Sequence, residues 1–216
     1  NKKTGTFGVM GTFSTFFSHH ISTMEGGIIA TDDDELYHIL LSLRAHGWTR
    51  DLPTNNLVCS EKNNESLKED FRFVLPGYNV RPLELQGAVG IEQIKKLPMI
   101  ISGRQKNAVL FRKLLANHPD LIIQKELGKS SWFGFSLVIR PKSKLNRVFL
   151  AKKLSSLGFE YRPIVTGNFA NNEVTKYFDS EVHGELENAD YIDKNGLFIG
   201  NHHYPMSDAF LVLGEI

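Results

Sequence analysis

The stretch 14–27 constrains the fold of this chain more than any other. Around it, residues 5–30 alternate small, polar and aromatic side chains, a pattern typical of β-strands, and the pair Gly26-Gly27 predicts a turn before an apolar strand. His19 and His20 lie in this β-rich run, and neighbouring side chains on a strand point to opposite faces. The two histidines therefore cannot share one metal ion, and we predict no metal site.

A helix is predicted after this run, followed by a long loop. Thr31 and Asp34 are typical of a helix start, with Asp in place of the usual Glu of a capping box, and Gly47 stands where the helix should stop. Residues 48–77 are polar and contain two Asn-Asn pairs. Such a stretch predicts a loop with functional potential.

The second half of the chain combines two further helices with a small α+β domain. Residues 82–96 and 98–117 predict the helices, because Pro98 suits the first turn of a new helix. After Pro119 the pattern changes to strand, strand, helix, strand, which predicts an α+β domain. Its expected elements are strands at 121–127, 132–139, 159–162 and 197–200, and helices at 148–157, at 189–195 and after a cap at Ser207.

Composition excludes several classes of function. The 216 residues carry a net charge of +1, so no strong field would attract nucleic acid or an acidic membrane surface. The apolar runs are far shorter than a membrane span. Cys59 is the only cysteine, which excludes an internal disulfide and fits a reducing cytoplasm. Because the sequence begins Asn-Lys-Lys-Thr-Gly, without an apolar signal core, we expect the middle of a gene product.

Two groups of polar residues could carry chemistry, although each has a plainer explanation. His19 could move protons near neutral pH, yet a histidine is as often part of a hydrogen-bonded scaffold. The segment Gly77-Tyr78-Asn79-Val80-Arg81-Pro82 offers the amide donor of Asn79 and the planar fork of Arg81, which suits a carboxylate or a phosphate. The same segment could be a turn before a helix, with the arginine simply solvated.

Two further groups contain arginine at the ends of expected elements. His46 and Arg50 lie where the first helix runs into the loop, and they could contact a substrate or could only suit the helix dipole. Arg162 opens the segment Arg162-Pro163-Ile164-Val165-Thr166-Gly167-Asn168-Phe169 at a strand end. Loops at strand ends are frequent binding positions, but many are plain connections.

The chain resembles the sugar aminotransferases of fold type I, the DegT/DnrJ/EryC/StrS family, over nearly its whole length. The segments that carry the resemblance are FFSHHISTMEGG, LRAHGWTR, LPGYNVRP, GIEQIKKLP, SSWFGFS, RPIVTGNF and DKNGLFIGNHH. In that family a lysine five residues after a serine binds pyridoxal phosphate covalently, and here His19 stands at that position, five residues after Ser14. The chain is most similar to the dehydratases of the family, in which a Ser-His pair replaces the lysine.

The resemblance implies both a fold and a reaction. The chain would be the C-terminal part of an α/β, aspartate aminotransferase-like fold, with 1–118 in the large cofactor-binding domain and 119–216 as a small α+β C-terminal domain. The N-terminal half of that fold is not in this sequence, so the fragment alone is expected to be inactive. The reaction would remove the C3 hydroxyl of GDP-4-keto-6-deoxymannose, with pyridoxamine phosphate as cofactor and L-glutamate to regenerate its amine. The product would be GDP-4-keto-3,6-dideoxymannose.

The resemblance also assigns roles to individual residues. His19 would act as the base, and Ser18 would position it or protonate the departing hydroxyl. Ser14 and Asn79 would bind the phosphate of pyridoxal phosphate or pyridoxamine phosphate, with Asn79 reaching across a homodimer whose active sites are shared. The residues expected to bind substrate are His46, Arg50, Arg81 and Arg162.

Other family members provide alternatives. A related CDP-sugar dehydratase uses an iron–sulfur cluster, which typically needs about four thiolates, so Cys59 alone excludes such a cluster. An aminotransferase that keeps its amine would need a lysine at position 19. A catalytically silent binding or regulatory relative would be expected to have lost Ser14, Asn79 and Arg81. We therefore expect a cytoplasmic enzyme whose partners are a GDP-sugar, L-glutamate and a second subunit, with neither nucleic acid nor membrane.

Overall fold

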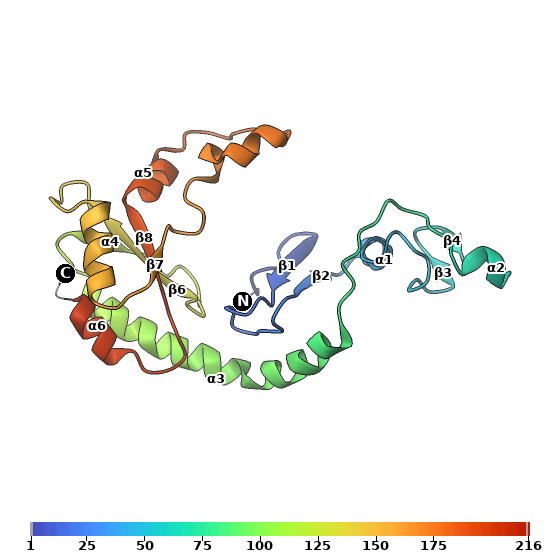
Figure 1. Cartoon of the computed structure of the whole chain (residues 1–216), viewed down its shortest axis with the longest axis horizontal. Helices are drawn as coiled ribbons and strands as arrows, with labels where there is room; N and C mark the ends of the chain where they lie inside the picture. Colours follow the sequence, from blue (N-terminus) through green and yellow to red (C-terminus); the bar gives the residue numbers. More distant parts are fainter. Residues whose placement is uncertain (1, 215) are drawn as a thin grey trace. The chain divides into compact units, whose positions relative to one another are not determined.

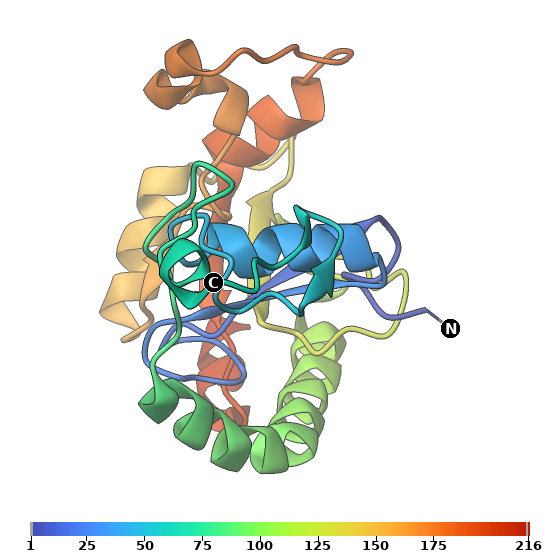
Figure 2. The same ribbon diagram turned by 90° about the vertical axis from the view of Figure 1, so that its right-hand side faces the viewer.

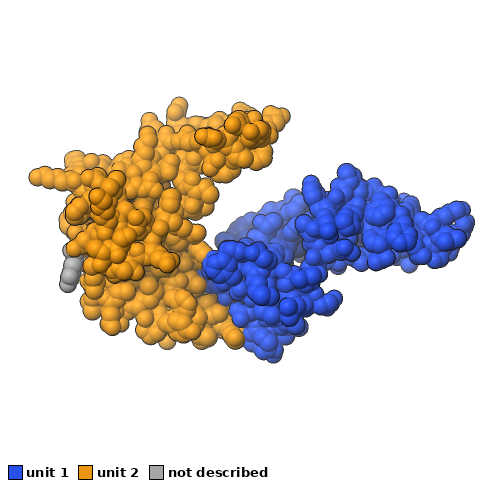
Figure 3. Space-filling model, in the orientation of Figure 1, with its two compact units in different colours: residues 1–95 blue, residues 96–216 orange. Residues whose placement is uncertain are grey.

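Two compact units make up the chain, residues 1–95 and residues 96–216 (Figure 3). The structure is a computed structural model, and it describes residues 2–214 and 216. The domain limits expected from the sequence, at 118 and 119, stay a prediction. Within the described residues, no helix is both long and apolar enough to cross a membrane.

Unit 1 begins with an antiparallel hairpin of β1 (Met10–Ser14) and β2 (Gly27–Thr31), shown in Figure 1. Phe13 pairs with Ile28 in the register, and Thr12 pairs with Ile29, so apolar side chains lie on both faces of the hairpin. The histidines at 19 and 20 lie in the loop between the strands, so their predicted place on a strand was wrong. The physical reason is a turn at residues 16–19, where the His19 N–H donates to the Phe16 carbonyl over 2.9 Å.

Helix α1 (Asp34–Leu43), seen side-on in Figure 2, follows β2. Its cap is Asp33, whose carboxylate accepts the Leu36 N–H at 2.9 Å, so the predicted capping pair was wrong. The Thr31 hydroxyl instead accepts the Asp33 N–H at 3.2 Å, and Thr31 lies two residues before the cap. The helix does end at Gly47, whose N–H donates to the Ser42 carbonyl at 2.8 Å; the preceding His46, with a φ of +64°, turns the backbone there, and Gly47 itself has a φ of +82°.

Residues 48–77 contain only short elements, as expected of a loop. These are β3 (Asn55–Asn56), β4 (Ser60–Glu61) and α2 (Ser66–Glu69). The next element is one continuous helix, α3 (Glu84–Leu115), with Pro98 in its interior, so the prediction of two helices was wrong. Proline removes one backbone donor and crowds the preceding turn, at a cost of about 3 kcal/mol. The helix continues because its C-terminal half is anchored by Phe111 and Leu115, which are fully buried.

Unit 2 is an α+β arrangement, as the sequence predicted. A four-stranded antiparallel sheet has the strand order β5-β6-β8-β7. Its strands are β5 (Leu121–Ile123), β6 (Gly134–Ile139), β7 (Tyr161–Arg162) and β8 (Gly196–Gly200). The accompanying helices are α4 (Arg147–Ser156), η1 (Phe169–Asn171), η2 (Glu173–Tyr177), α5 (Glu187–Asn195) and α6 (Ser207–Leu213). Ser207 is the first residue of α6, which is preceded by Met206 at the cap, so the predicted serine cap was wrong.

The core of unit 2 lies on one face of this sheet. Burial alternates along β6, where Phe135, Leu137 and Ile139 are buried and Ser136 is half-buried, as the two-residue period of a strand requires. The Phe135 ring stacks on that of Phe111, with centroids 4.0 Å apart. The other core residues come from α3, α4, β8 and α6 and include Leu115, Leu150, Leu154, Leu197, Ile199, Phe210 and Leu213. The sheet therefore holds its helices through one apolar face.

Candidate active site

The loop that carries Ser18 and His19 is closed at its base by the backbone. The Thr15 N–H donates to the Gly26 carbonyl at 3.0 Å, and the Thr23 N–H donates to the Thr15 carbonyl at 2.8 Å. Inside the loop, the ring of His19 meets that of Phe16 edge-on, with centroids 6.2 Å apart. Ser18 is exposed and His19 is half-buried. The hairpin thus presents a Ser-His pair on a short, hydrogen-bonded loop.

Ser14 ends strand β1 beside this loop. Its hydroxyl oxygen accepts the Phe16 N–H at 3.2 Å, and the residue is exposed. A hydroxyl that accepts one hydrogen bond still has its own proton to donate. Ser14 can therefore donate to an anion such as a phosphate, as a cofactor-binding serine must.

The structure brings two of the predicted motifs together. The segment that contains Asn79 lies along the end of α1, because the His46 N–H donates to the Tyr78 carbonyl at 2.7 Å and the Val80 N–H to the Arg44 carbonyl at 3.0 Å. Asn79 itself forms an isolated antiparallel bridge with Ala45. His46, Asn79 and Arg81 are all exposed. The exposed residues of these two adjacent segments form one surface, which we call the Asn79 surface; they are His46, Arg50, Tyr78, Asn79, Val80 and Arg81.

Two glycines allow the backbones of this surface to approach each other. A Cβ atom on Gly47 would lie 1.6 Å from the Leu75 carbonyl oxygen, and a Cβ on Gly77 would lie 2.0 Å from the Gly47 nitrogen. Neither position can hold a side chain without moving the backbone. The sequence indicated Gly47 only as a helix stop, and the close approach depends on Gly77 thirty positions later.

Arg50 is held by a tryptophan that sequence reasoning did not single out. Its guanidinium carbon lies 3.7 Å from the centroid of the Trp48 ring. The same ring stacks with Phe71 and Phe73, at 5.5 Å in each case, and its Nε1–H donates to the Asp70 carbonyl at 2.9 Å. A stacked guanidinium keeps its donors in the plane of the fork, where an anion can bind them.

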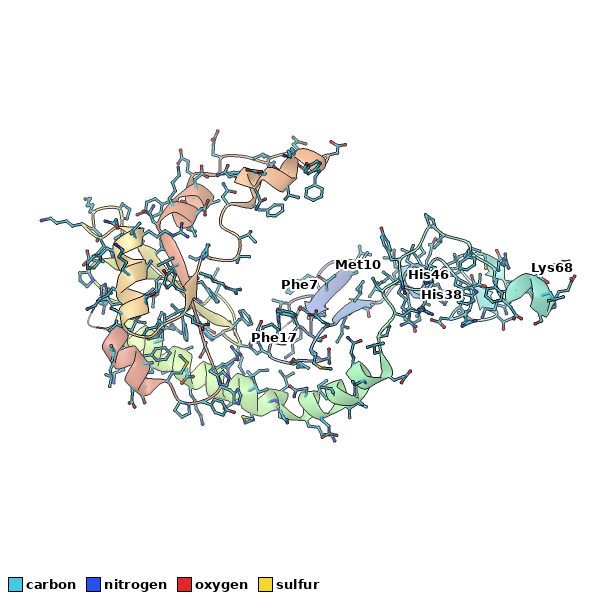
Figure 4. The ribbon with its side chains drawn as sticks, in the orientation of Figure 1. Phe7, Met10, Phe17, His38, His46 and Lys68 are labelled. Atoms are coloured by element: carbon cyan, nitrogen blue, oxygen red, sulfur yellow. The ribbon has the colours of Figure 1, made fainter. Side chains whose placement is uncertain are left out.

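The loop and the Asn79 surface lie at separate places in unit 1. Figure 4 labels Phe17, which lies in the loop, and His46, which lies on the surface, and the two are drawn well apart. One chain therefore does not bring His19 together with the predicted substrate and cofactor residues at 46, 79 and 81. No group of three or more His, Cys, Asp or Glu side chains in the described part of the chain could hold a metal ion.

Arg162 belongs to unit 2, where it ends strand β7. Its guanidinium carbon lies 4.9 Å from the Phe198 ring centroid and 6.0 Å from that of Phe133, and the residue is exposed. The loop that follows is fixed by Asp190, which accepts the amide N–H groups of Asn168 and Asn171 at 2.8 Å each. The hydrogen bond from Asn168, and then that from Asn171, lower the pKa of Asp190.

Several known proteins are similar to this chain over most or all of its length. A sequence profile of the DegT/DnrJ/EryC1/StrS aminotransferase family matches residues 1–209. The chain is 58% identical to GDP-4-keto-6-deoxy-D-mannose 3-dehydratase of Escherichia coli O55:H7, over 100% of the chain and 56% of that relative. It is also 58% identical to the protein of the same name from Yersinia pseudotuberculosis, over 96% of the chain and 53% of the relative.

A solved structure of GDP-4-keto-6-deoxymannose-3-dehydratase with a trapped PLP-glutamate geminal diamine matches with a TM-score of 0.96. The match has 58% identity and covers 100% of this chain and 56% of that one. The expected fold, the C-terminal part of an aminotransferase-like fold, is confirmed by this match. The chain spans about half the length of the curated relatives it matches.

Proposed function

The chain belongs to the DegT/DnrJ/EryC1/StrS aminotransferase family, and we propose that the whole protein is a dehydratase of nucleotide sugars. Its reaction removes the C3 hydroxyl of GDP-4-keto-6-deoxymannose as water and gives GDP-4-keto-3,6-dideoxymannose. Pyridoxamine phosphate is the cofactor; the nitrogen of its amine leaves as ammonia by hydrolysis, which restores the 4-keto group, and L-glutamate then regenerates the amine of the cofactor. The observation that carries this proposal is His19, which stands five residues after Ser14 where the family has its lysine.

A histidine at this position changes the chemistry. Imidazole cannot bind the cofactor aldehyde covalently as a lysine does, but it exchanges protons near neutral pH. An aminotransferase, whose sugar product retains the transferred amine, would therefore need a lysine at position 19. A silent relative is disfavoured because Ser14, Asn79 and Arg81 are all retained.

The donors present suit the cofactor. Ser14 donates from its hydroxyl and Asn79 from its side-chain amide, and both would hold the phosphate. When bound, the cofactor supplies an amine that condenses with the 4-keto group of the sugar and a conjugated ring that takes up electrons as the hydroxyl leaves. The imidazole of His19 accepts the proton from the carbon beside that amine. Ser18 orients the imidazole or gives a proton to the departing oxygen.

The arginines suit the two anionic partners. The fork of Arg81 matches the carboxylate of L-glutamate, and the stacked guanidinium of Arg50 suits the diphosphate of a GDP-sugar. His46 belongs to the same Asn79 surface, since its N–H donates to the Tyr78 carbonyl at 2.7 Å. A relative with a trapped PLP-glutamate adduct supports glutamate as the amino donor. Arg162, at the end of β7, is placed at a strand end where a sugar could bind.

A homodimer completes the site in this proposal. In one chain the His19 loop and the Asn79 surface lie apart (Figure 4), so each could complement the other only from a second subunit. Asn79 and Arg81 would then reach the partner's cofactor. The single cysteine favours a reducing compartment, and we place the enzyme in the cytoplasm.

The test uses the full-length protein with the substitution His19→Asn. NMR of the product, with L-glutamate present, monitors dehydration of the GDP-sugar. The variant should no longer dehydrate the sugar but should still bind the cofactor. In the wild type, borohydride reduction with pyridoxal phosphate followed by peptide mapping should yield no lysine adduct in the active site. Dehydration that survives in the variant would place the base elsewhere, and a reduced lysine adduct would refute the noncovalent cofactor.

A further inference from the structure

We propose that a buried pair of threonines, Thr15 and Thr23, is a clasp that positions His19 for the proposed proton transfer. His19 stands midway between them in the sequence, four residues from each. The effect of the clasp on catalysis rests on the proposed function. The hydrogen bonds of the clasp are a feature of the loop and do not depend on that function.

The clasp is a directed chain of hydrogen bonds. The two hydroxyl oxygens lie 2.7 Å apart, and each residue is 7% exposed. The Thr23 hydroxyl has two carbonyl acceptors, that of Glu25 at 2.8 Å and that of Thr15 at 3.4 Å, and we assign its proton to the nearer one; Thr15 is then the donor between the two hydroxyls. The Glu25 carbonyl also accepts the side-chain amide of Gln86 at 2.7 Å. The base of the His19 loop is thereby tied both to itself and to helix α3.

Two glycines let the backbone approach the pair closely. A Cβ atom on Gly26 would lie 2.6 Å from the Thr15 hydroxyl oxygen and 2.8 Å from that of Thr23. A Cβ on Gly90 would lie 3.4 Å from the Thr23 methyl group, so α3 runs close past it. Buried hydroxyls that lose their partner cannot turn to water, and the loop would have to move to satisfy them.

The position of the base matters because proton transfer demands close alignment. A misplacement of about 1 Å can cost on the order of 100-fold in rate. The clasp holds the two ends of the loop, and the bond from the His19 N–H to the Phe16 carbonyl forms the turn within it. We expect loss of the clasp to lower kcat rather than to raise KM for the GDP-sugar, since neither threonine is exposed to a ligand.

Matched substitutions in the full-length enzyme test the clasp. Thr15→Val and Thr23→Val keep the shape of the side chain and remove the hydroxyl, and each should lower kcat by roughly 10- to 100-fold with KM nearly unchanged. The double variant should be no worse than Thr23→Val, because that single variant already removes both the bond between the hydroxyls and the bond to the Glu25 carbonyl. Thr23→Ser keeps the hydroxyl and should keep most of the activity. Thr175→Val removes a hydroxyl–carbonyl bond of 2.7 Å in unit 2 and should not affect kcat.

Hydrogen exchange provides a readout that does not depend on activity. In both valine variants, the peptide that covers residues 14–27 should exchange its amides at least tenfold faster, and peptides of unit 2 should not change. If Thr23→Val does not fold, Thr15→Val carries the same test, because it leaves the bond from Thr23 to Glu25 intact. A wild type that does not dehydrate the GDP-sugar would refute the proposed function. The clasp would be refuted by unchanged exchange, by faster exchange with unchanged kcat, or by a Thr23→Ser variant as impaired as Thr23→Val.

Discussion

Replacing Trp48 with leucine should weaken binding of the GDP-sugar without abolishing the reaction. The guanidinium of Arg50 lies 3.7 Å from the centre of the Trp48 ring, and leucine fills part of that space but offers no π face. An exposed cation–π contact contributes about 0.5–1 kcal/mol, and each 1.4 kcal/mol corresponds to a factor of about ten. KM for the GDP-sugar should therefore rise roughly two- to five-fold.

Trp48→Phe is the matched control. It keeps an aromatic face for Arg50 and loses the hydrogen bond from the indole to the Asp70 carbonyl. A neutral hydrogen bond of this kind contributes about 0.5–1.5 kcal/mol, so the free energy of unfolding should fall by that amount while KM changes little.

A double-mutant cycle with Arg50→Gln decides whether Trp48 acts through the arginine. Steady-state kinetics of the full-length enzyme should show that Trp48→Leu raises KM only when Arg50 is present. If the leucine variant raises KM by the same factor in the Arg50→Gln background, the tryptophan acts on the substrate or on the fold directly, and the reasoning fails.

Three further predictions concern stability and the sugar site. Phe111→Ala should lower the free energy of unfolding by about 3–5 kcal/mol, measured by denaturant titration, because the ring is fully buried and stacked on Phe135. Asp190→Asn should lower Tm near neutral pH, because hydrogen bonds in the folded state lower the pKa of the wild-type carboxylate. The carboxylate's contribution to stability is fully present above the unfolded pKa of 3.8 and is lost as pH falls through the folded pKa. The Tm values of wild type and variant should therefore converge in strong acid. Equal Tm values at pH 7 would contradict this. Arg162→Lys should impair the GDP-sugar half-reaction more than the glutamate half-reaction in stopped-flow measurements, and equal impairment of both would leave the arginine without a role in sugar binding.

Local patterns in the sequence predicted the elements that local forces determine. The strand pattern at 132–139 and the helical pattern at 148–157 each correspond to an element in the same place, β6 and α4. The prediction of a helix break at Pro98 was wrong because it used only the local preference of proline. Helix α3 continues through Pro98 because the core around Phe111, further along the helix, holds it. Tertiary packing overrode the local preference.

The candidate site shows the same limit. Alternation alone placed His19 on a strand, but the bond between Thr15 and Thr23 closes a loop there, and nothing in a run of small and polar residues marks it. The stack of Arg50 on Trp48 depends on Phe71 and Phe73, which lie in a polar stretch more than twenty residues later. Only the resemblance to known enzymes pointed to the replaced lysine, and the roles of the site residues stay proposals.

The hairpin at the start of unit 1 has a practical consequence for anyone who produces this stretch of chain by itself. Phe13 and Ile28 are 43% and 54% exposed on one face, and Ile29 is 50% exposed on the other. In the described part of the chain this hairpin is a two-stranded sheet, and a two-stranded ribbon with apolar side chains on both faces can pair with strands of other molecules at its edges. We expect the isolated polypeptide to collect in inclusion bodies, and its recovery in soluble form would depend on covering these strands, by coexpression with the missing part of the fold or by charged substitutions at 13 and 29.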